Sequence, residues 1–218
     1  MDQTAPLLAL SAAWFGYGLL HSILASLTLK QWAAARWPGL MPAYRLLYNL
    51  MAVATLVPIM GWLMRYPGPL LWQWTGFWRW LGNGLALAAL AALLAPGSGY
   101  DTGAFLGWRA WREGRPEGGD SELFRIGFLH RFVRHPWYAL SLVILWTRDM
   151  TALRLVSALW ITGYFILGSR FEEAKLILAH GERYRRYRAR VAALVPLPWK
   201  TLSRAEARHL EAGCAGTE

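Results

Sequence analysis

The sequence predicts an all-α, polytopic membrane protein with about five transmembrane helices, including a C-terminal helical hairpin, followed by a cytosolic C-terminal helix. Two observations predict this class. Hydrophobic residues make up 56% of the 218 residues and charged residues only 17%, whereas soluble domains carry about 25% charged residues. The apolar residues also gather in long runs, and a helix needs roughly 20 of them to cross a bilayer.

Three apolar runs in the N-terminal part predict membrane-spanning helices over 6–28, 45–64 and 78–95. The first run lacks the preceding basic residues of a signal peptide and exceeds the usual length of its apolar region, so we expect a retained helix. Many of the 14 tryptophans flank these runs, as is typical of aromatic side chains at the level of lipid headgroups. Residues 1–95 therefore form a predicted group of three spans.

The apolar stretch from Trp137 to Gly168 is too long for one span and has polar residues in its middle. It predicts a helical hairpin with a short arm, 137–147, and a full arm, 152–169. An arm of about 11 residues cannot span the bilayer alone, so we expect it to pack on neighbouring helices. In the charged stretch 171–191 apolar residues recur at helical spacing, which predicts a cytosolic extension of the last span, broken at Gly181.

The distribution of basic residues predicts the orientation of the chain. With five spans, the segments 29–45, 96–136 and 170–218 lie on one side and carry 19 of the 23 lysines and arginines. Basic residues concentrate on the cytoplasmic side of membrane proteins. We therefore expect an inner-membrane protein with its N-terminus outside and its C-terminus in the cytoplasm. Its domains are then the three spans, a cytosolic loop over 96–136, the hairpin with its cytosolic helix over 137–198, and a polar tail over 199–218.

The net charge of +10 does not indicate nucleic-acid binding, because the basic residues flank the membrane helices. We interpret this charge as a determinant of orientation and of contact with anionic lipids in the bilayer. Cys214 is the single cysteine, so an intramolecular disulfide is excluded, and the sequence has no cluster of metal-ligand spacing. We expect no metal site and no nucleic-acid partner, and the oligomeric state stays open.

Two polar segments border the predicted hairpin on its cytosolic side. Residues 134–138 read Arg-His-Pro-Trp-Tyr, and Pro136 suits the first turn of a helix, where backbone N–H groups can bind a carboxylate. Glu172 and Glu173 follow the full arm, and adjacent carboxylates can bind an ammonium group, a sulfonium or ribose hydroxyls. Because a hairpin returns its exit beside its entrance, we expect these side chains to converge. Each segment alone also fits a structural role, as a capped helix start or a solvated turn.

In order and spacing these residues resemble the C-terminal signature of the isoprenylcysteine carboxyl methyltransferase family and its phospholipid-methyltransferase relatives. That signature is an Arg-His-Pro-x-Tyr start, a hydrophobic hairpin, Glu-Glu-x-x-Leu, a glycine and two tyrosines. The matching residues of this chain are Arg134, His135, Pro136, Tyr138, Glu172, Glu173, Leu176, Gly181, Tyr184 and Tyr187. The N-terminal half looks instead like short bacterial relatives, so the resemblance does not specify the substrate.

The resemblance implies an S-adenosylmethionine-dependent methyltransferase that acts at the cytosolic membrane face. Its substrate would be a lipophilic or lipid-linked molecule, or a small thiol or carboxylate. The implied cofactor-binding residues are His135, Pro136, Tyr138, Glu172, Glu173 and Tyr187. The implied catalytic residues are Arg134, Arg170 and Glu173, of which the two arginines would bind a carboxylate of the cofactor or the substrate.

Three other functions stay open. Sterol reductases resemble this family at the C-terminus but bind NADPH there, and they are usually longer than this chain. Some short bacterial membrane proteins of nitrogen-oxide metabolism, and related carotenoid isomerases, use membrane histidines, and His21 and His130 could ligate haem in the same way. A lone intramembrane histidine is more often a packing residue. The third alternative is a membrane scaffold without enzymatic activity.

Overall fold

The computed structural model describes residues 4–66, 68–95, 103, 106–115 and 124–212. Four helices are long and apolar enough to cross a membrane, namely Thr4–Ala25, Pro38–Arg65, Gly76–Leu94 and Ala152–His180, and the shorter helix Pro136–Trp146 is also apolar. The predicted all-α, polytopic membrane class is therefore confirmed. Much of the predicted loop over 96–136, and Cys214, lie outside the described residues.

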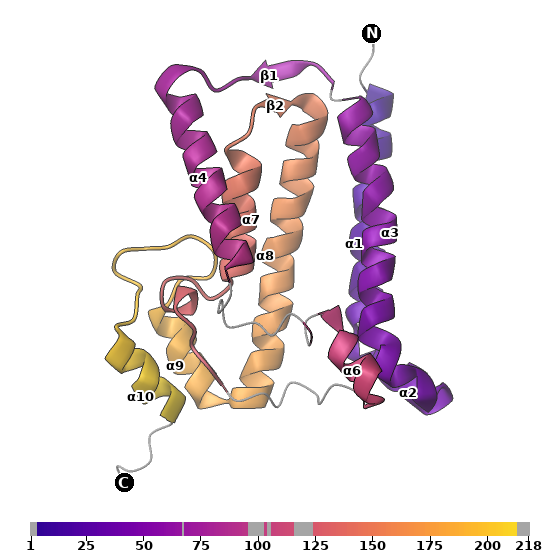
Figure 1. The fold of residues 1–218 in the computed structure, drawn as a ribbon, viewed down its shortest axis with the longest axis vertical. Helices are drawn as coiled ribbons and strands as arrows, with labels where there is room; N and C mark the ends of the chain where they lie inside the picture. The colour runs from indigo at the N-terminus through magenta and orange to yellow at the C-terminus, as the bar shows by residue number, and fades with distance from the viewer. Residues whose placement is uncertain (1–3, 67, 96–102, 104–105, 116–123, 213–218) are drawn as a thin grey trace. The chain divides into compact units, whose positions relative to one another are not determined.

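The first of two compact units comprises Met1–Gln73, Tyr100–Glu117 and Asp149–Ile161. Within it α1 (Thr4–Ala25) packs beside α3 (Tyr44–Arg65) (Figure 1). The core of this unit consists of Leu10, Trp14, Ile59 and Leu153. These two helices fall within a few residues of the predicted spans over 6–28 and 45–64.

The first span ends earlier than predicted, because Ser26 starts a second helix. α2 (Leu27–Arg36) begins directly after it, and the Ser26 hydroxyl accepts a hydrogen bond from the backbone N–H of Leu29 at 3.2 Å. Serine is a preferred residue at this position because its oxygen satisfies an otherwise unpaired helix N–H. A short 3₁₀ helix, η1 (Pro38–Ala43), then connects α2 to α3.

A two-stranded ribbon and a short helix complete the first unit. β1 (Leu70–Trp72) pairs antiparallel with β2 (Met150–Thr151), and β2 lies in the polar break predicted in the middle of the hairpin. α6 (Trp108–Glu113) follows Gly107, whose φ is +80°. A Cβ at Gly107 would lie 2.6 Å from the backbone nitrogen of Leu46, so this position requires glycine.

The second unit comprises Trp74–Gly99, Gly118–Arg148 and Thr162–Glu218. In it α4 (Gly76–Leu94) packs along α7 (Pro136–Trp146), the short arm of the hairpin (Figure 1). The packing is close at Gly82, where a Cβ would lie 3.1 Å from the carbonyl oxygen of Thr147. Arg148 fixes this end of α7 by donating to the Gly82 carbonyl and to the Asn83 side chain, each at 2.9 Å. The prediction that the short arm is supported by a neighbouring helix is confirmed.

The last span is one continuous helix, α8 (Ala152–His180), of 29 residues. Such a helix is about 44 Å long, longer than a hydrocarbon core of about 30 Å, so its last turns extend beyond the apolar region. It ends at Gly181, whose φ is +58°, and α9 (Glu182–Arg190) follows. The predicted extension of the last span and its break at Gly181 are confirmed.

The predicted polar tail contains a further helix, α10 (Arg204–Ala212). The Ser203 hydroxyl accepts a hydrogen bond from the Glu206 backbone N–H at 3.2 Å, and the Glu206 carboxylate accepts one from the Ser203 N–H at 2.7 Å. This reciprocal pair is a capping box. The helix is held by a small core that contains Ile126, Tyr184, Tyr187, Val191, Leu202 and Ala207.

Candidate functional site

Backbone hydrogen bonds from the C-terminal segment fix the residues that enter α7. Val133 forms a parallel β-bridge with Ala192. The Arg134 N–H donates to the Ala192 carbonyl at 2.8 Å, and the His135 N–H donates to the Ala193 carbonyl at 3.1 Å. The extended backbone before a proline suits such pairing, and α7 then starts at Pro136, which is buried. The side chains of Arg134 and His135 are thereby directed to the last turns of α8.

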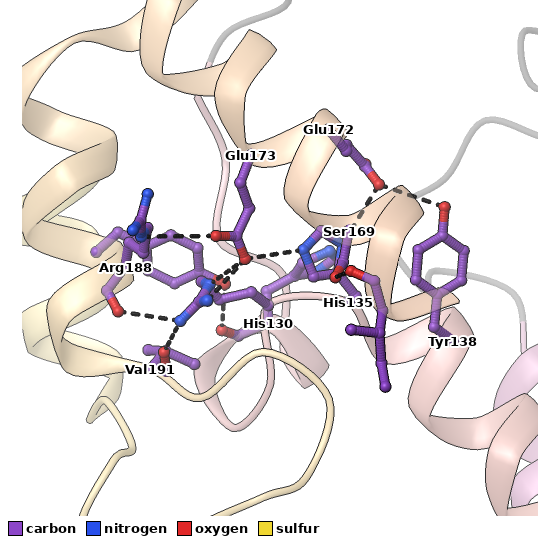
Figure 2. A network of polar contacts seen from close by, with 11 residues as sticks. His130, His135, Tyr138, Ser169, Glu172, Glu173, Arg188 and Val191 are labelled. Carbon is purple, nitrogen blue, oxygen red and sulfur yellow. Dashed lines mark hydrogen bonds and ion pairs between the residues drawn. The ribbon is translucent and has the colours of Figure 1, made fainter. Parts of the chain in front are cut away.

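Glu173 on α8 is the centre of the polar cluster in Figure 2. Its Oε1 accepts hydrogen bonds from Arg134 Nε at 2.8 Å and from His135 Nε2 at 3.1 Å, and it lies 2.7 Å from Arg134 Nη2. Its Oε2 forms an ion pair with Arg188 Nε of α9 at 3.6 Å. The Glu173 side chain is only 9% exposed. A buried carboxylate is stable when cations and hydrogen-bond donors surround it, and this one joins the entrance of α7 to α8 and α9.

His135 lies between the two glutamates. Its Nε2 contacts Glu173, and its Nδ1 lies 3.3 Å from Glu172 Oε2. Burial alone would lower the pKa of His135, but its hydrogen bonds to Glu172 and Glu173 and their negative charges raise the pKa above the usual value of 6.5. The protonated imidazolium is the form that donates from both nitrogens. The geometry therefore favours a positively charged His135 that holds both carboxylates.

An aromatic stack adjoins this pair. The ring of Tyr138 lies 5.5 Å from that of His135 and 4.5 Å from that of Phe165, and it is within 10° of parallel to each. The Tyr138 hydroxyl donates to Glu172 Oε2 over a long 3.5 Å. Gly168 borders the same hydroxyl, since a Cβ there would lie 3.9 Å from it. The Glu172 side chain is 47% exposed, so it is the carboxylate of this cluster that a ligand can reach.

The two tyrosines of α9 are buried beside the cluster. Tyr184 and Tyr187 are buried, and the Tyr187 hydroxyl donates to the His130 carbonyl at 2.7 Å. Burial, followed by the nearby charge of His135, lowers the pKa of His130. Burial, followed by the charge of Glu173, raises the pKa of Tyr184. At neutral pH His130 and Tyr184 are therefore uncharged and add no charge to the cluster of Arg134, His135 and Arg188.

Several proteins of assigned activity are similar to this chain, and they share one name. The methanethiol S-methyltransferase of Pseudomonas deceptionensis is 34% identical over 194 residues, which cover 83% of this chain and 69% of that protein. The methanethiol S-methyltransferase of Mycobacterium tuberculosis is 31% identical over 196 residues, covering 84% and 75%. The chain belongs to the methanethiol S-methyltransferase family. A third member, methanethiol S-methyltransferase 2 of Bradyrhizobium diazoefficiens, is 32% identical over 183 residues, covering 83% and 69%.

Membership of the methanethiol S-methyltransferase family confirms the prediction of a membrane methyltransferase. No family model matches the chain, and no solved structure matches it. The more specific resemblance to the isoprenylcysteine carboxyl methyltransferases therefore stays a prediction.

The structure brings most of the residues singled out in the sequence into one cluster. Arg134, His135, Tyr138, Glu172 and Glu173 are in mutual contact, and their roles toward a ligand stay predictions. Tyr187 contacts the cluster through the backbone of His130, and Pro136 lies buried at the first turn of α7. Arg170 is exposed on α8 and, among the described residues, forms no hydrogen bond or ion pair.

Two residues of the cluster were not predicted from the sequence: Arg188, which pairs with Glu173, and Phe165, which stacks on Tyr138. Phe165 could have been found, because it lies seven residues before Glu172 and therefore on the same side of one helix. Arg188 had no distinguishing signal, because it is one of five arginines in the nine residues of α9.

Proposed function

We propose that this membrane methyltransferase transfers a methyl group from S-adenosylmethionine to the sulfur of a small, lipophilic thiol at the cytosolic face of the bacterial inner membrane. The observation that carries the proposal is the cluster of Arg134, His135, Glu172 and Glu173 at the end of α8, with Glu172 half-exposed. The names of three relatives, which state that those proteins methylate methanethiol at sulfur, support a thiol as the acceptor.

The residues of the cluster fit the groups of this cofactor. S-Adenosylmethionine carries an ammonium group and ribose hydroxyls, which need acceptors, and a carboxylate, which needs donors. Glu172 can supply the acceptor, because its contacts to His135 and Tyr138 are long, at 3.3 and 3.5 Å, and its side chain is half-exposed. Arginine side chains can supply the donors. The stack of Tyr138 on Phe165 offers aromatic surface beside the acceptor.

The residues of the chain contribute positioning to the reaction. S-Adenosylmethionine held there would supply an electrophilic methyl group on a positively charged sulfur. The thiolate sulfur would form the new bond to this carbon as the carbon–sulfonium bond breaks, and S-adenosylhomocysteine would leave as a neutral thioether. Arg134 holds Glu173, and His135 Nδ1 holds Glu172 Oε2, so the acceptor carboxylate is in place before a ligand arrives. Because its imidazole lies between two carboxylates, His135 acts as a donor and not as the base that accepts the thiol proton. Preorganised contacts of this kind lower the barrier by fixing the reacting groups.

The apolar character of the chain supports a small or lipophilic acceptor. The cluster adjoins the last turns of an apolar span, so a thiol dissolved in the bilayer reaches it without crossing a long aqueous path. The attacking species is the thiolate, and a small alkyl thiol carries no other group that must be desolvated. A lipid-linked carboxylate, the acceptor implied by the isoprenylcysteine resemblance, is the second candidate.

The test of the proposal combines binding with product analysis. We expect purified protein to bind S-adenosylmethionine in calorimetry, to give no heat with NADPH, and to show no Soret band. Incubation with methanethiol and a methyl-deuterated cofactor should yield labelled dimethyl sulfide, and a farnesyl-cysteine analogue should yield no labelled ester. Binding of NADPH alone would favour the reductase alternative, stoichiometric haem would favour the haem alternative, and label in the ester would identify a carboxylate acceptor.

Orientation is a separate part of the proposal, supported by the concentration of 19 of the 23 basic residues on one predicted side. A fluorescent reporter at the C-terminus should be active in the cytoplasm, and an alkaline phosphatase reporter placed before Pro6 should be active outside. An active cytoplasmic reporter at the N-terminus would mean an even number of spans and would contradict the predicted hairpin.

A further inference from the structure

The arginine that the sequence offers for a ligand carboxylate is already engaged within the protein. All three guanidinium nitrogens of Arg134 have partners: Nε and Nη2 contact Glu173 Oε1, and Nη1 donates to the carbonyls of Arg188 and Val191. The Arg134 side chain is 11% exposed. Binding a ligand through Arg134 would require breaking these contacts, so its role is to hold Glu173 and α9 in place.

Arg188 is the guanidinium of this cluster that a ligand can reach. Its side chain is 51% exposed, and its ion pair to Glu173 is long, with 3.6 Å between Nε and Oε2. Figure 2 shows Arg188 on one side of the Glu173 carboxylate and His135 on the other. Because a guanidinium carries five N–H donors, this long ion pair leaves donors of the half-exposed Arg188 side chain for a ligand.

The charges of the cluster also leave one cation in excess. Arg134 pairs with Glu173, and protonated His135 pairs with Glu172. Arg188 shares Glu173 with Arg134 at a longer distance, so three positive groups face two carboxylates. An additional negative group would balance this charge, and the planar guanidinium of arginine binds a carboxylate through two parallel hydrogen bonds.

We propose that Arg188 binds the carboxylate of the S-adenosylmethionine amino-acid group, an inference that rests on the proposed function. Glu172, at the His135 side of the cluster, is then left for the ammonium group or the ribose hydroxyls. Arg188 is thus a cofactor-binding residue at a position where the resemblance to known methyltransferases assigns none.

The experiment compares two ligands that differ in one group, S-adenosylmethionine and its decarboxylated analogue, by calorimetry on the full-length protein in detergent or nanodiscs. We expect wild-type protein to bind S-adenosylmethionine about 10- to 100-fold more tightly than the analogue, the range of a charge-assisted pair. In Arg188→Gln this preference should fall to about one, because S-adenosylmethionine loses affinity and the analogue does not. Arg188→Lys, which keeps the charge but not the fork, should retain part of the preference.

Arg185→Gln is the matched control. Arg185 lies one turn earlier on α9, is 61% exposed, and pairs at 3.7 Å with Glu182 rather than with the cluster. The Arg185→Gln variant should bind both ligands as the wild type does. Arg185→Gln and Arg188→Gln should both keep the wild-type melting temperature within a few degrees.

The possible outcomes separate the two levels of inference. Wild-type protein that does not bind S-adenosylmethionine contradicts the proposed function itself. Wild-type protein that binds the cofactor with no preference over the analogue, or an Arg188→Gln variant that keeps the preference, contradicts the role of Arg188 alone. Equal loss of both ligands in Arg188→Gln would mean that Arg188 acts through its contact with Glu173, which also overturns the inference.

Discussion

His21 in the first unit and His135 in the second lie in surroundings of similar packing but different charge. His21 stacks on Tyr17 with ring centres 5.7 Å apart and forms a hydrogen bond with the Tyr48 hydroxyl. His135 also stacks on a tyrosine, Tyr138, but its two nitrogens contact carboxylates. Neutral partners make a histidine a packing residue, whereas carboxylates on both sides make it a cation that orders a binding site. This difference in charge supports the proposal that the ligand binds in the second unit.

The largest expected effect comes from removing the charge that organises the second region. In Glu173→Gln the guanidinium of Arg134, which is mostly buried, loses its carboxylate, and breaking such a pair is strongly destabilising. We expect the free energy of unfolding in mixed micelles to fall by about 3 kcal/mol. Tyr48→Phe, which removes the neutral partner of His21, should cost only about 1 kcal/mol. Equal costs would show that charge does not distinguish the two regions.

Cofactor binding separates the two histidines directly. His135→Ala removes the donor that holds Glu172 and Glu173, and loss of a charge-assisted partner costs about 1.5–3 kcal/mol. Affinity for S-adenosylmethionine in calorimetry should fall roughly tenfold to more than a hundredfold. The double variant Glu172→Gln/Glu173→Gln should lose affinity to the same order, and His21→Ala should bind normally. Normal binding by His135→Ala together with loss in His21→Ala would move the site to the first unit.

The charge of His135 predicts a dependence of stability on pH. The folded-state pKa of His135 is raised by Glu172 and Glu173 above the usual value of 6.5. Its stabilising contribution is therefore fully present below about pH 6.5 and is lost as pH rises through the raised pKa. The unfolding free energy of wild-type protein minus that of His135→Gln should shrink over this interval. Titrating groups remote from His135 are common to both proteins and largely cancel in the difference, whereas His130, whose pKa the charge of His135 lowers, does not cancel fully. A difference that stays constant or grows would mean that His135 is neutral.

Some of these features could be predicted from the sequence, for physical reasons that differ between residues. The convergence of Arg134 with Glu173 followed from topology, because a hairpin must return its exit beside its entrance. The division between buried Glu173 and half-exposed Glu172 could not be predicted. Adjacent residues on a helix point about 100° apart, and only the position of the α7 entrance decides which one faces inward. In the same way, the packing of Tyr184 and Tyr187 decides which arginine of α9 faces the cluster.

The smallest expected effect concerns a helix that the sequence did encode. Ser203 and Glu206 have the spacing of a capping box, which the polar composition of the tail obscured. The box holds α10, and the Leu202 N–H just before it donates to the Arg131 carbonyl at 2.9 Å, near the entrance of α7. Ser203→Ala should destabilise α10 by about 1 kcal/mol, seen as faster amide exchange within α10.

Ser26→Ala is the control for Ser203→Ala, because Ser26 caps α2 in the first unit. It should cost a similar amount but accelerate exchange only in α2. The Ser203 variant should also weaken S-adenosylmethionine binding slightly, by less than about threefold, since α10 supports the segment that precedes His135 without touching the site. Binding that falls as far as in His135→Ala would mean that the tail contributes directly to the cofactor site. Exchange in α10 that does not change would mean that its core of Leu202 and Ala207, and not the cap, determines whether this helix forms.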